Sequence, residues 1–349
     1  MDAYSFLYHK WLDDGTRWYP LIAAYYLTYS CDFCCPYCAN GANVPYRHLP
    51  NTTVSGQTAL KILKRIRRHA SHLILTGGEP FMHPDAGLVI RGTSELGFRT
   101  VVLTTNGERL PEFLPDIVGN VTDLVVSVDT LNAIKADAWY GKGQGTLDRV
   151  LENVEHANRV RAAAKRPFTL TLATVVTPNN IDDVYHVYDY ARQRGCRFSA
   201  SPEQQGVAPP KQLRASDSYR ACFDFLLAEK ARGGDIFGSV QYLEHLRDFR
   251  PFVCHPLTML AVSPDGGVFY PCLEKANTIG SILTDDLHAL RREASRTCKR
   301  QTQPCPCACP SPCALGLSLL VERPIGEVSE AISGGFRALR TGKVRSNTL

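Results

Sequence analysis

Three cysteines early in the chain stand at a spacing that suits iron–sulfur chemistry. Cys31, Cys35 and Cys38 follow the pattern C-x3-C-x2-C. Three thiolates on so short a loop can ligate three irons of a [4Fe-4S] cluster and leave the fourth iron open for a substrate or cofactor. A structural zinc site, by contrast, needs four ligands and a closed shell. A zinc loop is nevertheless the alternative interpretation of these thiols. Cys34 falls outside the spacing, and we expect it to be a packed thiol.

The residues before these cysteines predict the element that positions them. The apolar, aromatic run at 21–28 indicates a buried strand, so the cysteines leave its carboxyl end, where α/β barrels carry their chemistry. Strands alternating with helices predict parallel βαβ units, and six strands are too few for a closed eight-stranded barrel. The further strands are predicted at 72–76, 100–105, 123–129, 168–176 and 196–200, and helices at 57–68, 146–157 and 181–194.

A second motif follows the predicted strand at 72–76. It consists of Gly77, Gly78, Glu79 and Pro80. Two glycines let the backbone approach a ligand closely, and the carboxylate of Glu79 can accept hydrogen bonds from an ammonium group. An ordinary glycine turn is the alternative, but two motifs in the same strand context are stronger evidence than either alone.

Together the two motifs resemble the radical S-adenosylmethionine (SAM) superfamily. The resemblance implies an α/β fold, a partial (β/α)6 barrel over residues 21–205. It also implies that the amino and carboxylate groups of SAM chelate the open iron, with Gly77–Pro80 near the amino group. Reductive cleavage of SAM in that family gives methionine and a 5'-deoxyadenosyl radical, which abstracts a hydrogen atom.

Other polar residues near the predicted strand ends are candidates for the same cofactor. Tyr37 resembles the family position that contacts adenine. Ser127 and Asp129 alternate on one predicted strand, so we expect both side chains to face the same way and to contact the SAM ribose. A strand-end Asp that caps the next turn is the alternative reading of Asp129. Thr105 and Asn106 are expected to line the pocket.

Three further features have weaker links to chemistry. Glu203 and Gln204 follow the last predicted strand and are expected at the barrel mouth as substrate contacts. Cys222 is a candidate hydrogen donor for an epimerisation. The run Gly-Lys-Gly-Gln-Gly at 141–145 looks like a phosphate loop, but it follows no strand at the right distance, and we predict a flexible loop.

A second group of cysteines lies in the C-terminal part of the chain. Cys254 and Cys272 bracket the predicted hairpin turn 263–267, and their C-x12-G-x4-C arrangement resembles the SPASM and twitch extensions of radical SAM enzymes. The resemblance implies an auxiliary [4Fe-4S] cluster, and a zinc ribbon is the alternative. Only the Cys309-x3-Cys313 spacing fits the end of a full SPASM pattern, which favours one auxiliary cluster over two. The candidate further ligands are Cys298, Cys305, Cys307, Cys309 and Cys313.

Composition narrows the class of protein. The 349 residues carry a net charge of +5, which is too small to argue for a nucleic-acid partner. No secretion signal or apolar run of membrane-spanning length is visible. Thirteen cysteines without a signal indicate metal or redox chemistry in a reducing compartment, so we expect a cytoplasmic protein. The predicted regions are a lead-in at 1–20, the barrel at 21–205, a helical connector at 206–250, a Cys-rich extension at 251–320, and a terminal helix and tail at 321–349.

The expected function is that of a radical SAM enzyme acting on a small molecule, such as a sugar, aminocyclitol or nucleoside, by dehydrogenation or epimerisation. Its expected cofactors are SAM, a SAM-binding [4Fe-4S] cluster and an auxiliary cluster, and its electron donor a flavodoxin or ferredoxin. One alternative is a peptide-modifying maturase, which is weakened because only 30 residues precede the first cysteine. The other is a non-catalytic iron–sulfur or zinc-binding protein.

Overall fold

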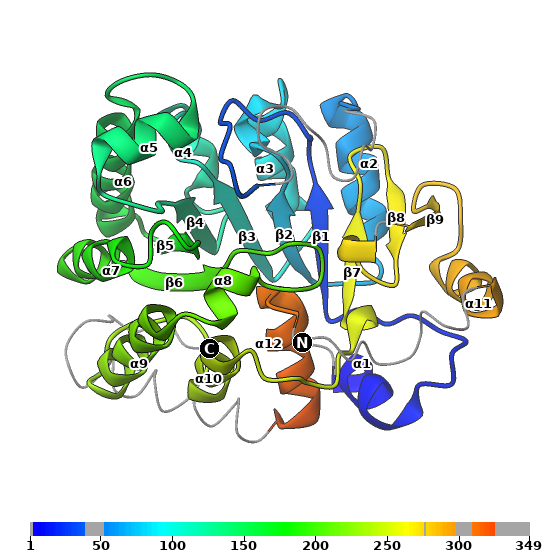
Figure 1. Cartoon of the computed structure of the whole chain (residues 1–349). Coiled ribbons are helices and arrows are strands. Elements are labelled where there is room, and N and C mark those ends of the chain that lie inside the picture. Colours follow the sequence, from blue (N-terminus) through cyan, green and yellow to red (C-terminus); the bar gives the residue numbers. More distant parts are fainter. Residues whose placement is uncertain (1–2, 39–51, 276, 298–308, 325–349) are drawn as a thin grey trace.

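The computed structural model describes residues 3–38, 52–275, 277–297 and 309–324. Through them runs one nine-stranded sheet in the order β6-β5-β4-β3-β2-β1-β7-β8-β9, which fans across the middle of the molecule (Figure 1). The strands are β1 (Ile22–Tyr26), β2 (His72–Thr76), β3 (Thr100–Thr105), β4 (Asp123–Ser127), β5 (Thr169–Val176), β6 (Arg197–Pro202), β7 (Met259–Val262), β8 (Gly267–Tyr270) and β9 (Asn277–Ser281).

The first six strands form the predicted parallel sheet. Each of β1 to β5 pairs in parallel with the next strand in the chain, and β6 is the edge strand of the sheet, as expected for a partial barrel. The predicted strands at 72–76 and 100–105 are confirmed at their bounds. The helices are α1 (Ala3–Leu7), α2 (Gly56–Arg67), α3 (Ala86–Glu95), α4 (Leu110–Ile117), α5 (Ala133–Tyr140), α6 (Thr146–Ala163), α7 (Asp183–Gln193), α8 (Lys211–Arg214), α9 (Asp217–Ala231), α10 (Val240–Asp248), α11 (Leu287–Thr297) and α12 (Pro312–Glu322).

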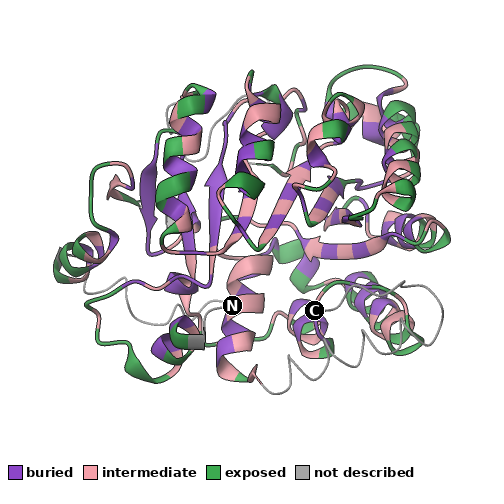
Figure 2. Ribbon diagram, turned by 180° about the vertical axis from the view of Figure 1, so that it is seen from behind, coloured by how far each residue is buried: buried purple, intermediate pink, exposed green. Residues whose placement is uncertain are grey.

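The two faces of the parallel sheet differ because successive side chains point to opposite sides of a strand. Leu75, Leu103 and Val126 are fully buried in the main hydrophobic core, which they share with the helices that cover the outer face. Figure 2 shows these helices from behind, with exposed sides outward and buried or intermediate sides toward the sheet. The alternate positions, Thr104 and Ser127 among them, are only partly buried or exposed, so the inner face of the sheet is accessible.

The C-terminal strands extend the barrel sheet. The predicted hairpin is confirmed, since β7 and β8 pair in antiparallel fashion across the turn at 263–266. Strand β7 also pairs in parallel with β1, a long-range pairing that no local pattern in the sequence predicts. A small second core holds the hairpin against β1 on the inner face, and it is made of Ala24, Tyr26, Tyr29, Ala261, Phe269 and Leu273.

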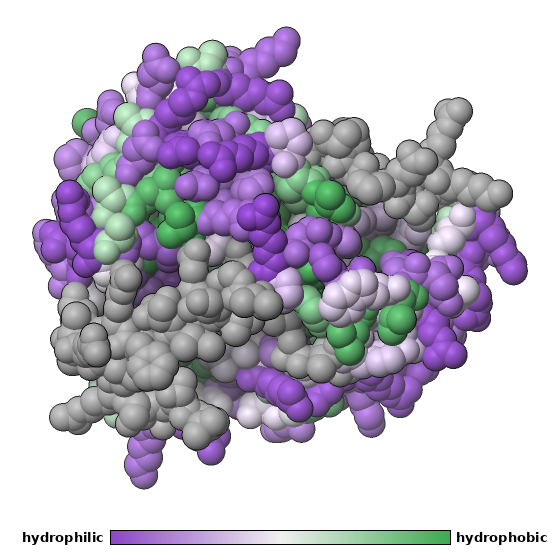
Figure 3. Space-filling view, turned by 90° about the horizontal axis from the view of Figure 1, so that it is seen from below, coloured by the Kyte–Doolittle hydropathy of each residue, from purple (hydrophilic) through white to green (hydrophobic). Residues whose placement is uncertain are grey.

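Helices α1, α8, α9, α10 and α12 lie below the sheet, and α11 lies beside β9 at its edge (Figure 1). Helices α8, α9 and α10 fall in the predicted helical connector at 206–250. Of the terminal helix and tail predicted at 321–349, residues 325–349 lie outside the described residues, and the boundaries of the five predicted regions stay predictions. None of the described helices has the length and apolar character that a membrane crossing requires. From below, the described surface is mainly hydrophilic, with hydrophobic residues in small groups (Figure 3).

Candidate active site

Two glycines bring the exits of β1 and β2 into direct backbone contact. The amide of Gly78 donates to the carbonyl of Thr28 at 2.8 Å, and the amide of Glu79 donates to the carbonyl of Ser30 at 2.8 Å. A Cβ atom added at Gly77 would lie 2.3 Å from the Thr28 oxygen, and one added at Gly78 would lie 2.3 Å from the Ser30 oxygen. The glycines therefore allow a backbone approach that fixes the residues directly before the cysteine loop.

Glu79 is a buried junction between the ends of β2 and β3. Its Oε1 accepts hydrogen bonds from the amide of Phe81 at 3.0 Å and the hydroxyl of Thr105 at 2.9 Å. Its Oε2 accepts from the amide of Asn106 at 2.6 Å. Burial raises the pKa of Glu79 to about 7, although the three hydrogen bonds act in the opposite direction. Glu79 thus holds two loop ends together, and a contact with SAM stays a prediction.

Asn106 continues this junction to the cysteine loop. Its side-chain Nδ2 donates to Oδ1 of Asp32 at 2.8 Å, and the other carboxylate oxygen of Asp32 pairs with Nζ of Lys142 at 2.7 Å. Sequence reasoning singled out Asn106 but missed Asp32 and Lys142. The available signals were an acidic residue inside the cysteine motif and a lysine between two glycines.

A second buried carboxylate anchors the other end of the cysteine loop. Asp129 is 1% exposed; its Oδ1 accepts from the amide of Val175 at 2.8 Å, and its Oδ2 accepts from the hydroxyl of Tyr37. Burial raises the pKa of Asp129 to about 6. Ser127 is the last residue of β4 and is exposed, whereas Asp129 lies beyond the strand and is buried. The expectation that both side chains face the same surroundings is therefore wrong.

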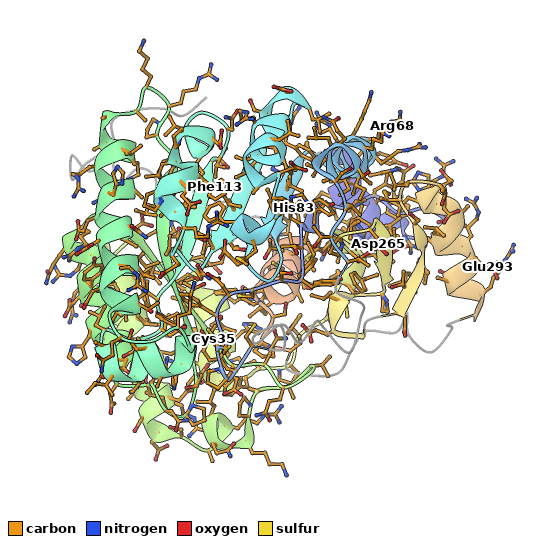
Figure 4. The ribbon with its side chains drawn as sticks, turned by 90° about the horizontal axis from the view of Figure 1, so that it is seen from above. Cys35, Arg68, His83, Phe113, Asp265 and Glu293 are labelled. Atoms are coloured by element: carbon orange, nitrogen blue, oxygen red, sulfur yellow. The ribbon has the colours of Figure 1, made fainter. Side chains whose placement is uncertain are left out.

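The three motif cysteines lie on this anchored loop and differ in solvent exposure. Cys31 and Cys35 are partly buried and Cys38 is exposed; Cys35 lies inside the arc of outer helices seen from above (Figure 4). The prediction that Cys34 is a buried, packed thiol is wrong, since Cys34 is exposed. Burial raises the pKa of Cys31 to about 12 and also raises the pKa of Cys35. At neutral pH these thiols hold their protons until a metal displaces them.

The donor chemistry of the loop fits an iron–sulfur cluster. Three closely spaced thiols can supply three of the four iron ligands. In the described part of the chain, no three His, Cys, Asp or Glu side chains converge closely enough to hold one metal ion. That result concerns single ions, because a four-iron cluster keeps its thiolates farther apart than one ion does.

The second cysteine group gathers at the open end of the β7–β8 hairpin. Cys254 precedes β7 and Cys272 follows β8. Both therefore lie toward the amino ends of β1 and β7, whereas the cysteine loop follows the carboxyl end of β1. Cys309 is buried, and burial raises its pKa to about 11, with smaller contributions from the nearby charges of Glu274 and Cys272. Cys313 lies in the first turn of α12. The candidates Cys298, Cys305 and Cys307 lie outside the described residues.

The remaining predicted residues have different positions. Glu203 is partly buried after β6, and its carboxylate accepts from Gln205 at 3.4 Å. Gln204 reaches the second cysteine group, since its Nε2 donates to Sγ of Cys309 at 3.6 Å. Cys222 is fully buried on α9 in the main core, so we remove it from the candidate site.

Comparisons with known proteins agree with this geometry. Residues 25–191 match the model of the radical SAM superfamily, and the chain belongs to that superfamily. It is 31% identical over 180 residues to an AdoMet-dependent heme synthase of Methanosarcina barkeri, covering 50% of this chain and 48% of that protein. It is 28% identical over 226 residues to a GTP 3',8-cyclase of Marinobacter nauticus, covering 60% and 64%. The chain therefore spans about half to two thirds of the length of these relatives.

The fold similarity reaches beyond the matched barrel residues. The structure of native anSMEcpe with bound AdoMet has a TM-score of 0.60 and 16% identity, and the match covers 93% of this chain and 99% of that one. At this identity the similarity concerns the fold. Because the match covers nearly the whole chain, the protein has the α/β fold of a radical SAM partial barrel with a C-terminal extension.

We predict that Gly78→Ala prevents normal cluster loading. The new Cβ would force apart the backbones of β1 and β2 exits at Ser30, at a cost of about 1–3 kcal/mol of stability. Iron per protein after anaerobic reconstitution is the measurement. The matched control is Gly316→Ala inside α12, where the nearest atom would be 4.0 Å away and stability should rise by about 0.5–1 kcal/mol. Equal iron loading in the two variants would contradict the proposed role of this backbone contact in cluster loading.

We also predict a specific pH dependence from Glu79. Its folded-state pKa of about 7 lies above the ordinary value of 4.5, so the folded protein binds more protons between these values. The free energy of unfolding should therefore fall as pH rises from about 4.5 to about 7, by at most about 3 kcal/mol from this group. Urea denaturation of iron-free protein should show a flatter profile for Glu79→Gln. The exposed Glu152→Gln is the control, and identical slopes for Glu79→Gln and wild type would refute the assignment.

Proposed function

We propose that this radical SAM enzyme dehydrogenates a small polar molecule bound on the inner face of the barrel. The observation that carries the proposal is an accessible inner face lined by short hydroxyl side chains. Thr104 donates to the hydroxyl of Thr76 at 2.7 Å, and both residues are partly buried. Ser127 pairs in register with Ala173 on β5, which pairs with Ser199 on β6. These hydroxyl side chains can donate and accept hydrogen bonds with the hydroxyl groups of a substrate.

The cysteine loop is the proposed site of SAM and its cluster. When bound, they supply a reductive cleavage that yields methionine and a 5'-deoxyadenosyl radical able to take a hydrogen atom from a substrate carbon. Cys31, Cys35 and Cys38 would hold the cluster. The buried carboxylates of Glu79 and Asp129 would hold the surrounding loops in one arrangement through the hydrogen bonds described above. A flavodoxin or ferredoxin is the proposed source of the electron.

The second thiol group favours dehydrogenation over epimerisation. Cys254, Cys272, Cys309 and Cys313 are the described thiols that could hold an auxiliary cluster. Loss of a hydrogen atom leaves a substrate radical, which must give up one electron and one proton to become the oxidised product. An auxiliary cluster would take the electron, and solvent the proton. Epimerisation needs a hydrogen donor instead, and the thiol considered for that role, Cys222, is fully buried.

A nucleoside, sugar or aminocyclitol is the proposed class of substrate. The name of the GTP 3',8-cyclase relative states a nucleotide substrate, and the chain covers 64% of that protein at 28% identity. That relationship supports a polar, hydroxylated molecule of similar size. The hydroxyl-lined inner face fits the same class.

Replacing Cys31, Cys35 or Cys38 by Ala should abolish reductive SAM cleavage, because the cluster loses an iron ligand. Production of 5'-deoxyadenosine by anaerobically reconstituted, reduced protein is the measurement. The control is Cys34→Ala, which removes an exposed thiol from the same loop and should leave cleavage near the wild-type rate. Full cleavage by the three motif variants would overturn the proposed site.

Cys272→Ala should separate the two clusters. Wild-type protein should carry about eight irons, two clusters' worth, and the variant about half of them while still cleaving SAM. Cys196→Ala, which removes an isolated buried thiol, should keep the full iron content. Zinc in place of the lost iron, or unchanged iron in Cys272→Ala, would exclude Cys272 as a ligand of an auxiliary iron–sulfur cluster.

A further inference from the structure

The glycine-rich turn after α5 is packed against the cysteine loop. Gly141, Gly143 and Gly145 have φ angles of +69°, +98° and +78°, a backbone region that glycine adopts at little cost. The amide of Cys34 donates to the carbonyl of Tyr140 at 2.9 Å, where the turn begins. A Cβ atom at Gly141 would lie 3.1 Å from Cβ of Cys34. The turn at 141–145, which the sequence predicted to be a flexible loop, therefore has defined contacts with the cysteine loop at Cys34.

This turn brings Lys142 to Asp32. The Nζ–Oδ2 distance is 2.7 Å, and the Lys142 and Asp32 side chains are 30% and 12% exposed. The other carboxylate oxygen of Asp32 accepts from Asn106, and Nζ of Lys142 lies 6.0 Å from the ring centroid of Phe33. Because its ammonium group pairs with a carboxylate, Lys142 is not placed as the cation of a phosphate loop.

The ion pair bears on the charge beside the cluster ligands. Asp32 directly follows Cys31 in the chain, and its negative charge would oppose the addition of an electron to a cluster held there. A cation in contact with Asp32 cancels most of that opposing field. The pair is partly shielded from water, so salt screens it less than it screens a fully exposed pair.

We propose that Lys142 is a positioning residue that raises the reduction potential of the Cys31–Cys38 cluster by neutralising Asp32. The inference rests on the proposed function of the cysteine loop. It assigns a role to the Gly141–Gly145 turn, which the proposed function leaves unused. Its prediction concerns charge, so variants that restore neutrality must restore the potential.

The test compares Lys142→Gln, Lys142→Arg, Asp32→Asn and the double variant Lys142→Gln/Asp32→Asn. Each reconstituted protein takes one electron per SAM-binding cluster from dithionite in a potentiometric titration followed by electron paramagnetic resonance. Lys142→Gln should lower the ratio of reduced to oxidised cluster at fixed potential on the order of tenfold, as for a unit charge roughly 10 Å away at an effective dielectric constant near 20. Asp32→Asn should raise this ratio, while Lys142→Arg and the double variant should stay near wild type.

The control is Lys64→Gln, which removes the same charge from an exposed position on α2 and should leave the ratio unchanged. Equal ratios in all variants would overturn the proposal, as would a shift that the double variant fails to reverse. If Lys142→Gln loses iron, retention by Lys142→Arg and the double variant supports the charge role, and loss in all of them refutes it. Wild-type iron content and signal test the cluster site separately, since their absence would refute the proposed function itself.

Discussion

The close backbone approach at Gly77 and Gly78 is the contact on which the rest of the site depends. Side chains at these positions would collide with carbonyl oxygens of the β1 exit, so only glycine allows the hydrogen bonds to Thr28 and Ser30. Those bonds continue the pairing of β1 and β2 past the ends of the strands. The cysteine loop therefore leaves the sheet from a fixed point, directly beside Glu79.

Two buried carboxylates extend this fixed point into a frame. Glu79 bridges toward β3 through Thr105 and Asn106, and Asp129 bridges from β5 to Tyr37 inside the cysteine motif. A buried carboxylate that lost its donors would cost more than an apolar residue in its place. The hydrogen bonds of each buried carboxylate can thus form in only a few loop conformations. Such a restriction suits a loop on which three thiols are proposed to bind one cluster.

Local patterns in the sequence predicted the parallel strands, both cysteine groups and the glycine motif, because each depends on residues near one another in the chain. They did not predict the partners of the long-range contacts. Tyr37 and Asp129 are 92 residues apart, and Asp32 and Lys142 are 110 apart. The pairing of β7 with β1 has the same cause. The burial of Cys222 was not predicted either, because chain position alone does not show which face of α9 is buried.

The most direct test of the central claim is whether SAM binds the open iron of the cluster on this loop. Reduced protein would be mixed with SAM labelled with a magnetic isotope in its amino nitrogen, and electron–nuclear double resonance recorded on the cluster signal. A hyperfine coupling to the labelled nitrogen is the predicted result, and it should vanish in Cys35→Ala. A well-formed reduced cluster that shows no coupling to bound SAM would contradict the account.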